Sequence, residues 1–193
     1  MDFLNWRNIV AVLLGAVVAG AIIGAYKVYE NSKRNSIGEK LYKVELLLLQ
    51  NKTAEAEKLA DEIPPPSSAY AYLKLGDYFF SADKPQKALR YYTEAEKELR
   101  ELDYPLYYFT VEKKAYLLYR MGLFKKSLGE LEAIDETAPN FCSAQLLRGQ
   151  DYIALGQKEK ARRTLVKVVE LCGADPEVVS TAKYLLATAF KEK

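Results

Sequence analysis

Few residues of this sequence belong to the types that carry out catalysis or bind metals. It contains no histidine, so the commonest general base and the commonest metal ligand are both missing. Its two cysteines, Cys142 and Cys172, are thirty residues apart and lack the paired CxxC spacing of a structural zinc site. It also has no GxSxG, P-loop or HExxH motif. The sequence therefore predicts no enzyme, no metal site, no cofactor and no small-molecule substrate.

One group of carboxylates between residues 94 and 101 resembles an acid–base cluster in composition. Two basic residues, Lys97 and Arg100, are interleaved with it. Mixed charges at this spacing are typical of a solvated helix face. We therefore expect solvent exposure for Glu94, Glu96, Glu98 and Glu101.

The composition is that of a folded protein with balanced charge. Of the 193 residues, 50% are hydrophobic and 28% are charged, which excludes disorder. The 28 basic and 26 acidic residues leave a net charge of only +2. A nucleic-acid-binding protein needs a basic face, so this balance argues against that class. The length allows one domain or a short repeat array together with a membrane segment.

An apolar segment follows a short N-terminal tail, residues 1–8. Residues 9–26 contain no charge and would span roughly 27 Å as a helix, close to the thickness of a bilayer's hydrocarbon core. Trp6 precedes the segment, and Tyr26 and Tyr29 stand at its other end, as in aromatic belts. We therefore predict a transmembrane helix over residues 9–26.

The alternative for this segment is a cleaved signal peptide, because Ala19-Gly20-Ala21 resembles a cleavage site. Asp2 in the tail and the continuation of the apolar run beyond Ala21 favour an uncleaved anchor. Within the anchor, Ala16, Gly20 and Gly24 form a stripe of small residues that allows close helix packing in lipid.

Basic residues near the anchor bear on its orientation. Arg7 and the α-amine lie before it, whereas Lys27, Lys33 and Arg34 follow it. The positive-inside rule therefore leans towards a cytoplasmic C-terminal domain, although a tail of eight residues makes the rule weak here.

Beyond a polar connector, residues 27–35, the apolar positions of residues 36–193 recur at the helical spacing of three and four. Three successive prolines within 63–68 give the clearest break. Asp175-Pro176-Glu177 is a strong start for a last helix over 176–190, which we predict to cap the domain.

A repeat is the most specific signal in the sequence. Residues 108–141 and 142–175 are both 34 residues long and align without gaps. Residues 69–107 share their offsets with five extra residues, and residues 37–68 fit loosely. The offsets resemble the tetratricopeptide repeat, through Tyr72, Leu75-Gly76, Phe79, Ala88 and Tyr92 in one unit and Gly149, Tyr152, Gly156, Ala161 and Leu165 in another. We therefore predict an all-α solenoid of such repeats; an irregular helical bundle would have to produce the period by chance.

Together, the anchor and the degenerate repeats resemble the bacterial YfgM-like family, which comprises ancillary subunits of the SecYEG translocon. Residues 146–162 and 127–134 are similar to recognisable segments of that family. The resemblance implies an inner-membrane protein with periplasmic repeats, and it implies the translocon, a periplasmic chaperone or an emerging polypeptide as partner. The short, weakly charged tail departs from the family and leaves this orientation open.

If the tetratricopeptide register holds, the first helix of each repeat lines an inner groove. The expected lining is aromatic and apolar with few charges, which suits a hydrophobic segment of a partner. Alternatively, some of the tyrosines among them pack against the capping helix or the first hairpin. The predicted groove residues are Tyr70, Leu73, Phe80, Phe109, Tyr116, Tyr119, Leu146 and Ile153, with Asp77, Glu112, Ser143 and Gln150 between them.

The register also places Cys142 and Cys172 at the same end of one helical hairpin. They form either a disulfide, which an oxidising compartment would favour, or two free thiols packed as small hydrophobes. Two functions remain open: an interaction protein that holds a chaperone or an emerging chain near the translocon, and a cytoplasm-facing membrane scaffold for another complex.

Overall fold

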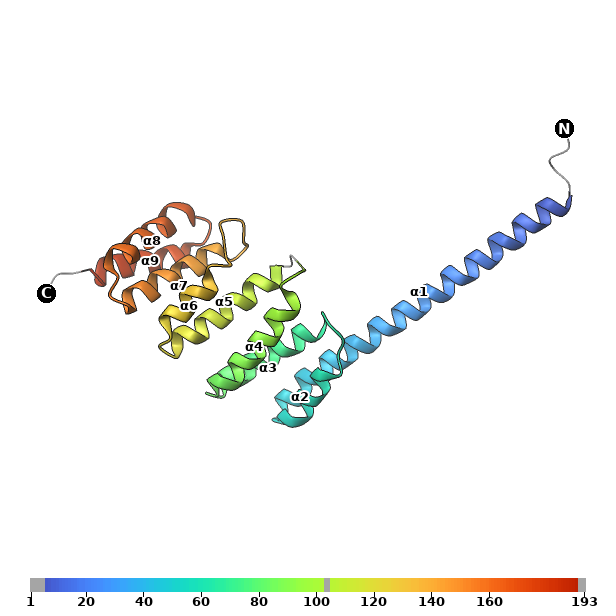
Figure 1. The fold of residues 1–193 in the computed structure, drawn as a ribbon, viewed down its shortest axis with the longest axis horizontal. Helices are drawn as coiled ribbons and strands as arrows, with labels where there is room; N and C mark the ends of the chain where they lie inside the picture. Colours follow the sequence, from blue (N-terminus) through green and yellow to red (C-terminus); the bar gives the residue numbers. More distant parts are fainter. Residues whose placement is uncertain (1–5, 103–104, 191–193) are drawn as a thin grey trace, which may run out of the picture.

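The computed structural model describes the backbone of residues 6–102 and 105–190, and the side chains of residues 22–102 and 105–190. These residues form α-helices and no strand, so the predicted all-α class is confirmed. Figure 1 shows the helices stacked as hairpins beside one long helix. They are α1 (Trp6–Leu49), α2 (Thr53–Asp61), α3 (Ser68–Ser81), α4 (Pro85–Leu99), α5 (Pro105–Arg120), α6 (Phe124–Leu131), α7 (Phe141–Ala154), α8 (Lys158–Leu171) and α9 (Pro176–Thr188).

The helices pair as successive hairpins along the chain. The end of α1 pairs with α2, and α3 with α4, α5 with α6 and α7 with α8, while α9 packs on the last hairpin. Helices α3, α5 and α7 begin within three residues of the predicted repeat starts at 69, 108 and 142. The capping helix α9 begins at Pro176, with the Asp175 side chain accepting a hydrogen bond from the backbone N–H of Val178.

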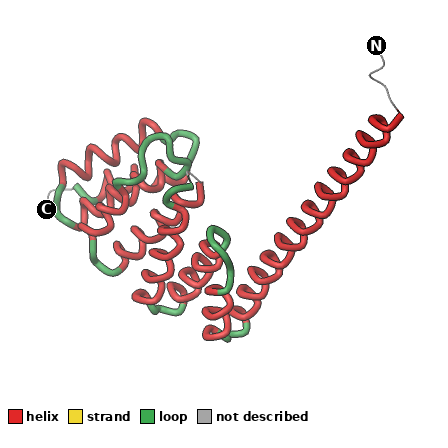
Figure 2. The backbone as a smooth tube through the Cα atoms, turned by 45° about the vertical axis from the view of Figure 1, so that its right-hand side comes forward, coloured by secondary structure: helices red, strands yellow, loops and turns green. Residues whose placement is uncertain are grey.

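The segment before the repeats differs from the sequence-based expectation. Residues 27–35, predicted as a connector, are helical, and α1 runs unbroken from Trp6 to Leu49. The segment has no proline, and Glu30 pairs with Arg34 one turn later at 2.6 Å, so nothing local ends the helix. In Figure 2, α1 extends far beyond the hairpins.

The predicted anchor, residues 9–26, lies mostly among residues whose side chains are outside the description. Within the part of the chain that is described, no helix is long and apolar enough to cross a membrane.

All four hairpin turns use the same local geometry. The turn residue has positive φ in each: Asn51 (60°), Asp83 (54°), Gly122 (74°) and Gly156 (69°). The next N–H bonds back to a carbonyl five residues earlier, as from Gln157 to Tyr152 at 2.9 Å. This is the Schellman arrangement, in which glycine, and to a lesser extent Asn or Asp, accepts the left-handed conformation. All four turns lie along one edge of the solenoid, because the two helices of each hairpin run in opposite directions (Figures 1 and 2).

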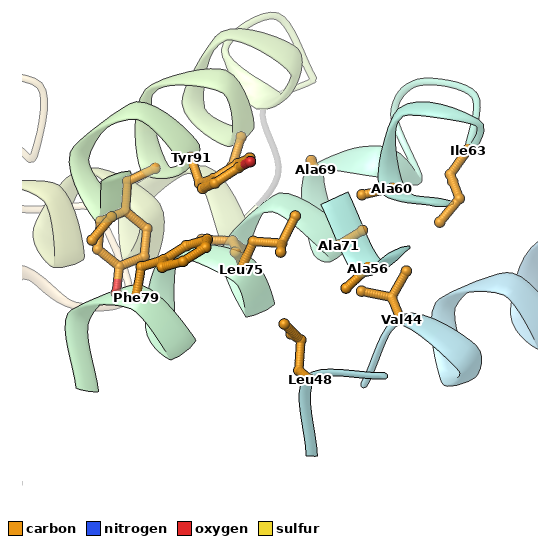
Figure 3. Close-up of a cluster of buried hydrophobic side chains, with 14 of the residues drawn as sticks. Val44, Leu48, Ala56, Ala60, Ile63, Ala69, Ala71, Leu75, Phe79 and Tyr91 are labelled. Atoms are coloured by element: carbon orange, nitrogen blue, oxygen red, sulfur yellow. The ribbon is translucent and has the colours of Figure 1, made fainter. Parts of the chain in front are cut away.

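Small residues let the two helices of a hairpin touch, as predicted for the glycines at 76 and 149. A Cβ at Gly76 would lie 2.5 Å from the Tyr92 ring, and one at Gly149 would lie 2.5 Å from a Leu165 methyl group. Between the first two hairpins, Figure 3 shows Val44 and Leu48 of α1 facing Leu75 of α3 in one apolar cluster. The first two hairpins therefore share one apolar cluster, and two further clusters fill the later hairpins.

Candidate functional site

We give the name aromatic face to the aromatic side chains of α3 and α5 that were predicted to line the groove: Tyr70, Phe80, Phe109, Tyr116 and Tyr119. The Phe80 and Tyr116 ring centroids lie 6.0 Å apart, and those of Tyr116 and Tyr119 lie 6.4 Å apart. Tyr70, Phe109 and Tyr116 keep 39%, 43% and 41% of their surface exposed. The face therefore bridges two repeats and leaves large rings in contact with solvent.

Arg120 also belongs to this face, although it was not among the groove residues predicted from the sequence. Its guanidinium lies 6.0 Å from the centroids of both Phe80 and Tyr116, within cation–π range. A hollow of about 370 Å³ opens beside it, lined by Phe80, Leu117 and Met121 together with the turn between α3 and α4. Arg120 thus places a positive charge at the rim of an apolar surface.

At its N-terminal end the aromatic face meets α1. Glu45 of α1 accepts a hydrogen bond from the Tyr70 hydroxyl at 2.9 Å and pairs with Lys74 at 2.9 Å. The hydrogen bonds from Lys74 and Tyr70 hold the pKa of Glu45 below its ordinary value. A second hollow, of about 490 Å³, lies between Leu48, Leu49 and Tyr78. The first repeat therefore extends the same surface with polar side chains.

Asp77 lies between these two regions. It accepts hydrogen bonds from the Tyr92 hydroxyl at 2.7 Å and from Lys113 at 2.8 Å, so α3 is tied to both α4 and α5. Glu112 of α5 accepts a hydrogen bond from Asn140 at 2.6 Å. These partly exposed carboxylates tie α3 to its neighbouring helices and α5 to the start of α7.

Three predicted groove residues lie elsewhere. Leu73 is buried in the core, with only 5% of its surface exposed, and Lys74 takes its place on the surface. One residue turns a helix by about 100°, so a small error in register exchanges a core position for a surface one. Leu146 and Ile153 are half-buried and pack into the cluster that contains α9. The aromatic face is thus narrower than predicted and ends at α5.

The carboxylates of residues 94–101 were all expected to be exposed to solvent, and for Glu96 this expectation is wrong. Glu96 is only 3% exposed and pairs with Lys114 of α5 at 2.6 Å and with Arg100 at 2.7 Å. Lys114 also reaches Glu130 of α6 at 2.8 Å. Burial alone would raise the pKa of Glu96, but the two cationic partners outweigh it and lower that pKa. The network joins three helices and has a structural role.

A buried carboxyl lies between the third and fourth repeats. Asp151 of α7 has no exposed surface and accepts a hydrogen bond from the Ser127 hydroxyl of α6 at 2.7 Å. Its Oδ1 atom has no hydrogen-bond partner among the described residues. Burial raises the pKa of Asp151 to about 6, despite the opposing effect of Ser127. Nearby, Arg148 donates hydrogen bonds to the carbonyls of Leu131, the last residue of α6, and of Ile134 just beyond it.

The two cysteines are joined in the structure. Cys142 opens α7 and Cys172 follows α8, and their Cα atoms are 5.7 Å apart in a disulfide. Of the proposed membrane-packing residues, Ala16 and Gly20 lie outside the described side chains, and Gly24 has open space around it. Across the residues that are described, no three His, Cys, Asp or Glu side chains are grouped to hold a metal ion.

No protein-family model and no curated protein matches this chain. Two solved structures do, both of the nearly identical TPR-like repeats of a kinesin-light-chain-like protein from Podosopora anserina. The first, of a variant with one glutamine replaced by methionine, has a TM-score of 0.60 at 14% identity, and the second has 0.58 at 15%. Each comparison covers 80% of this chain and 85% of the other. Such identity shows the fold alone, and the fold is a tetratricopeptide-like helical solenoid.

Proposed function

We propose that this protein is a membrane-anchored interaction module that binds an apolar segment of a partner protein on its aromatic face. The observation that carries the proposal is the contact of Phe80 with Tyr116 across two repeats, together with the exposure of Tyr70, Phe109 and Tyr116 on the same two helices. Exposed aromatic clusters of this kind mark contact sites, and central aromatic residues are the usual hot spots. The solenoid supplies rigid helices to present them.

The anchor proposed for residues 9–26 would hold this surface near a membrane. Ile22, Ile23 and Tyr26 on α1 are 57–64% exposed, and they continue the apolar run towards the repeats. The resemblance to YfgM-like proteins supports the finer proposal of an ancillary role at the SecYEG translocon, with a chaperone or an emerging chain as partner. The charges flanking the anchor instead favour the second candidate, a scaffold facing the cytoplasm.

Two variants separate the aromatic face from the anchor. We expect Tyr116→Ser/Tyr119→Ser to weaken partner capture at least tenfold, because each central ring contributes about 2 kcal/mol. Tyr184→Ser removes an exposed ring from α9, at 67% exposure, and should leave capture unchanged. Gly20→Leu/Gly24→Leu tests packing of the anchor. If only the glycine variant loses its co-purifying partners, the aromatic face is not the binding site.

A topology reporter separates the two candidate functions. Alkaline phosphatase fused to the C-terminus is active only outside the cytoplasm. Activity is expected for the translocon role; activity from a cytoplasmic reporter alone would exclude it.

A further inference from the structure

The near-zero net charge conceals two edges of opposite sign. At the edge formed by the hairpin turns, the last three turns, residues 83–90, 120–126 and 158–163, carry ten basic and two acidic side chains, whereas the first turn, residues 51–58, carries two of each. At the opposite edge, residues 94–101, 130–136 and 170–177 carry eleven acidic and two basic side chains. We call these the basic edge and the acidic edge. A short repeat array of neutral overall charge is therefore strongly polarised across its width.

The basic side chains at the basic edge are solvent-exposed and mostly lack carboxylate partners. Every Lys and Arg in its three segments is exposed. Only Lys87 has a carboxylate within 4.0 Å among the described residues, namely Glu57 at 3.3 Å. At the acidic edge, by contrast, Glu96 and Glu130 share Lys114. The cations are therefore free to attract an anionic partner.

The helices themselves do not require these cations. Lys125 and Lys126 lie in the first turn of α6, and Lys160 lies in the first turn of α8, beside the positive end of each helix dipole. Basic side chains there oppose the dipole and destabilise the helix. No side chain caps the N-terminus of either helix, so their free N–H groups add to the positive field. In α8 the acidic Glu159 partly offsets this effect, whereas the first turn of α6 has no acidic side chain, so the arrangement at α6 favours binding of an anion over stability of the helix.

The aromatic face runs into the basic edge. Arg120, the last residue of α5, stacks over Phe80 and Tyr116 and also belongs to the basic edge. The hollow beside it is lined by Phe80 and by Ser81 and Asp83 of the α3–α4 turn. A chain bound on the aromatic face would therefore meet the cations as it leaves.

Two other anionic partners, a nucleic acid and a membrane surface, fit the basic edge less well. The Tyr116 ring packs against Phe80 and Tyr119 and lies beneath Arg120, so part of its surface is already covered and less of it remains to stack on a base. The basic edge also lies at the end of α1 away from its N-terminus (Figure 1). Residues 26–49 of α1 span roughly 35 Å, which would keep this edge away from the membrane that holds the proposed anchor.

We propose that the basic edge binds an acidic polypeptide segment that continues an apolar segment held on the aromatic face. The proposal deepens the proposed function and rests on it for the apolar segment. Opposite charges at such a surface speed association and select the partner.

The test uses the full chain in nanodiscs of neutral lipid and two fluorescent peptides. Both contain the same leucine- and phenylalanine-bearing segment, followed in one by a run of glutamates and in the other by a run of glutamines. Fluorescence anisotropy should show the glutamate peptide binding at least ~tenfold more tightly, with the difference shrinking as salt is added. Equal binding of the two peptides would overturn the basic edge and leave the aromatic face intact.

Lys125→Glu/Lys126→Glu should abolish this preference, whereas Lys97→Glu/Lys183→Glu, which makes the same change in net charge elsewhere, should preserve it. The first variant places acids at the start of α6, where the helix dipole favours them, so its thermal midpoint should not fall. If Tyr116→Ser/Tyr119→Ser affects neither peptide, the proposed function itself fails. Stronger binding of oligothymidine or of phosphatidylglycerol vesicles than of the glutamate peptide would overturn the assignment to an acidic polypeptide.

Discussion

The Tyr92 ring lies against the backbone of Gly76, so that a Cβ at position 76 would lie 2.5 Å from Tyr92 Cε1. The Tyr92 hydroxyl then donates its hydrogen bond to Asp77, the next residue of α3. The contact fixes how closely α3 and α4 approach within the hairpin that carries Tyr70 and Phe80.

Gly76→Ala should therefore destabilise the protein by about 1–3 kcal/mol, because the ring and the backbone must separate. Gly129→Ala is the matched control: Gly129 is also helical, but nothing lies within 4 Å of its Cβ position. It should stabilise by about 0.5–1 kcal/mol through helix propensity. Urea denaturation followed by circular dichroism measures both. Equal effects of the two substitutions would contradict the close contact.

At the positive-φ positions of the hairpin turns, substitution by alanine should lower the stability of the protein and substitution by glycine should not. Gly156→Ala should cost about 1 kcal/mol because φ is 69° there, whereas Asp83→Gly should cause no loss because φ is 54° at Asp83. Thermal melts of the two variants at one pH make the comparison. A stable Gly156→Ala variant would show that the turn does not need the left-handed conformation.

The buried Asp151 predicts a pH-dependent stability. Its pKa of about 6 in the folded chain exceeds its ordinary value, so the folded state holds the proton more tightly than the unfolded state. Its contribution to stability is therefore full below pH ~4 and is lost as the pH rises through about 6, by about 3 kcal/mol. Asp151→Asn removes the titrating group and should raise the denaturation midpoint at neutral pH relative to the natural chain.

Ser127→Ala provides the control for this effect. It removes the hydrogen bond that favours the Asp151 carboxylate, so it should lower stability at neutral pH while leaving the carboxyl in place. Denaturation curves between pH 4 and pH 8 distinguish the two variants. If Asp151→Asn destabilises the chain at neutral pH as much as Ser127→Ala does, the carboxylate is not the unfavourable group.

The cysteine pair predicts a dependence on reductant. A bridge closing a loop of about thirty residues contributes on the order of 3 kcal/mol, so reduction should lower the denaturation midpoint. Cys142→Ala/Cys172→Ala should show no response to reductant. Mass spectrometry after alkylation of the natively expressed, non-reduced chain gives the direct readout. Two alkylated thiols would exclude the bridge and weaken the case for a periplasmic domain.

The features that follow from local rules could be predicted from the sequence. The 34-residue period set the hairpins, and Gly76 and Gly149 marked the close contacts, because each depends on residues within one repeat. The pairing of Glu96 with Lys114 could not be predicted, because it joins two repeats and the i,i+4 pattern on α4 was satisfied without it.

The surface was predicted less completely than the core. Leu73 and Lys74 are adjacent in sequence, and only the packing of α3 against α1 decides which of them faces the core. Likewise, Leu146 was predicted to line the groove, but α9 covers it. That contact depends on the docking angle of the last helix, which the sequence does not reveal. The charged segments that form the two edges are visible in the sequence, but their opposite charges cancel in the net charge of the chain.

Site-specific photocrosslinking at Tyr116 tests the central claim most directly. A benzoylphenylalanine introduced at Tyr116, or at Tyr184 of α9 as control, preserves an exposed aromatic side chain at either position. In living cells the aromatic face should give a defined protein adduct from position 116 and none from position 184. Adducts from position 184 with none from position 116 would contradict the aromatic face as the binding surface.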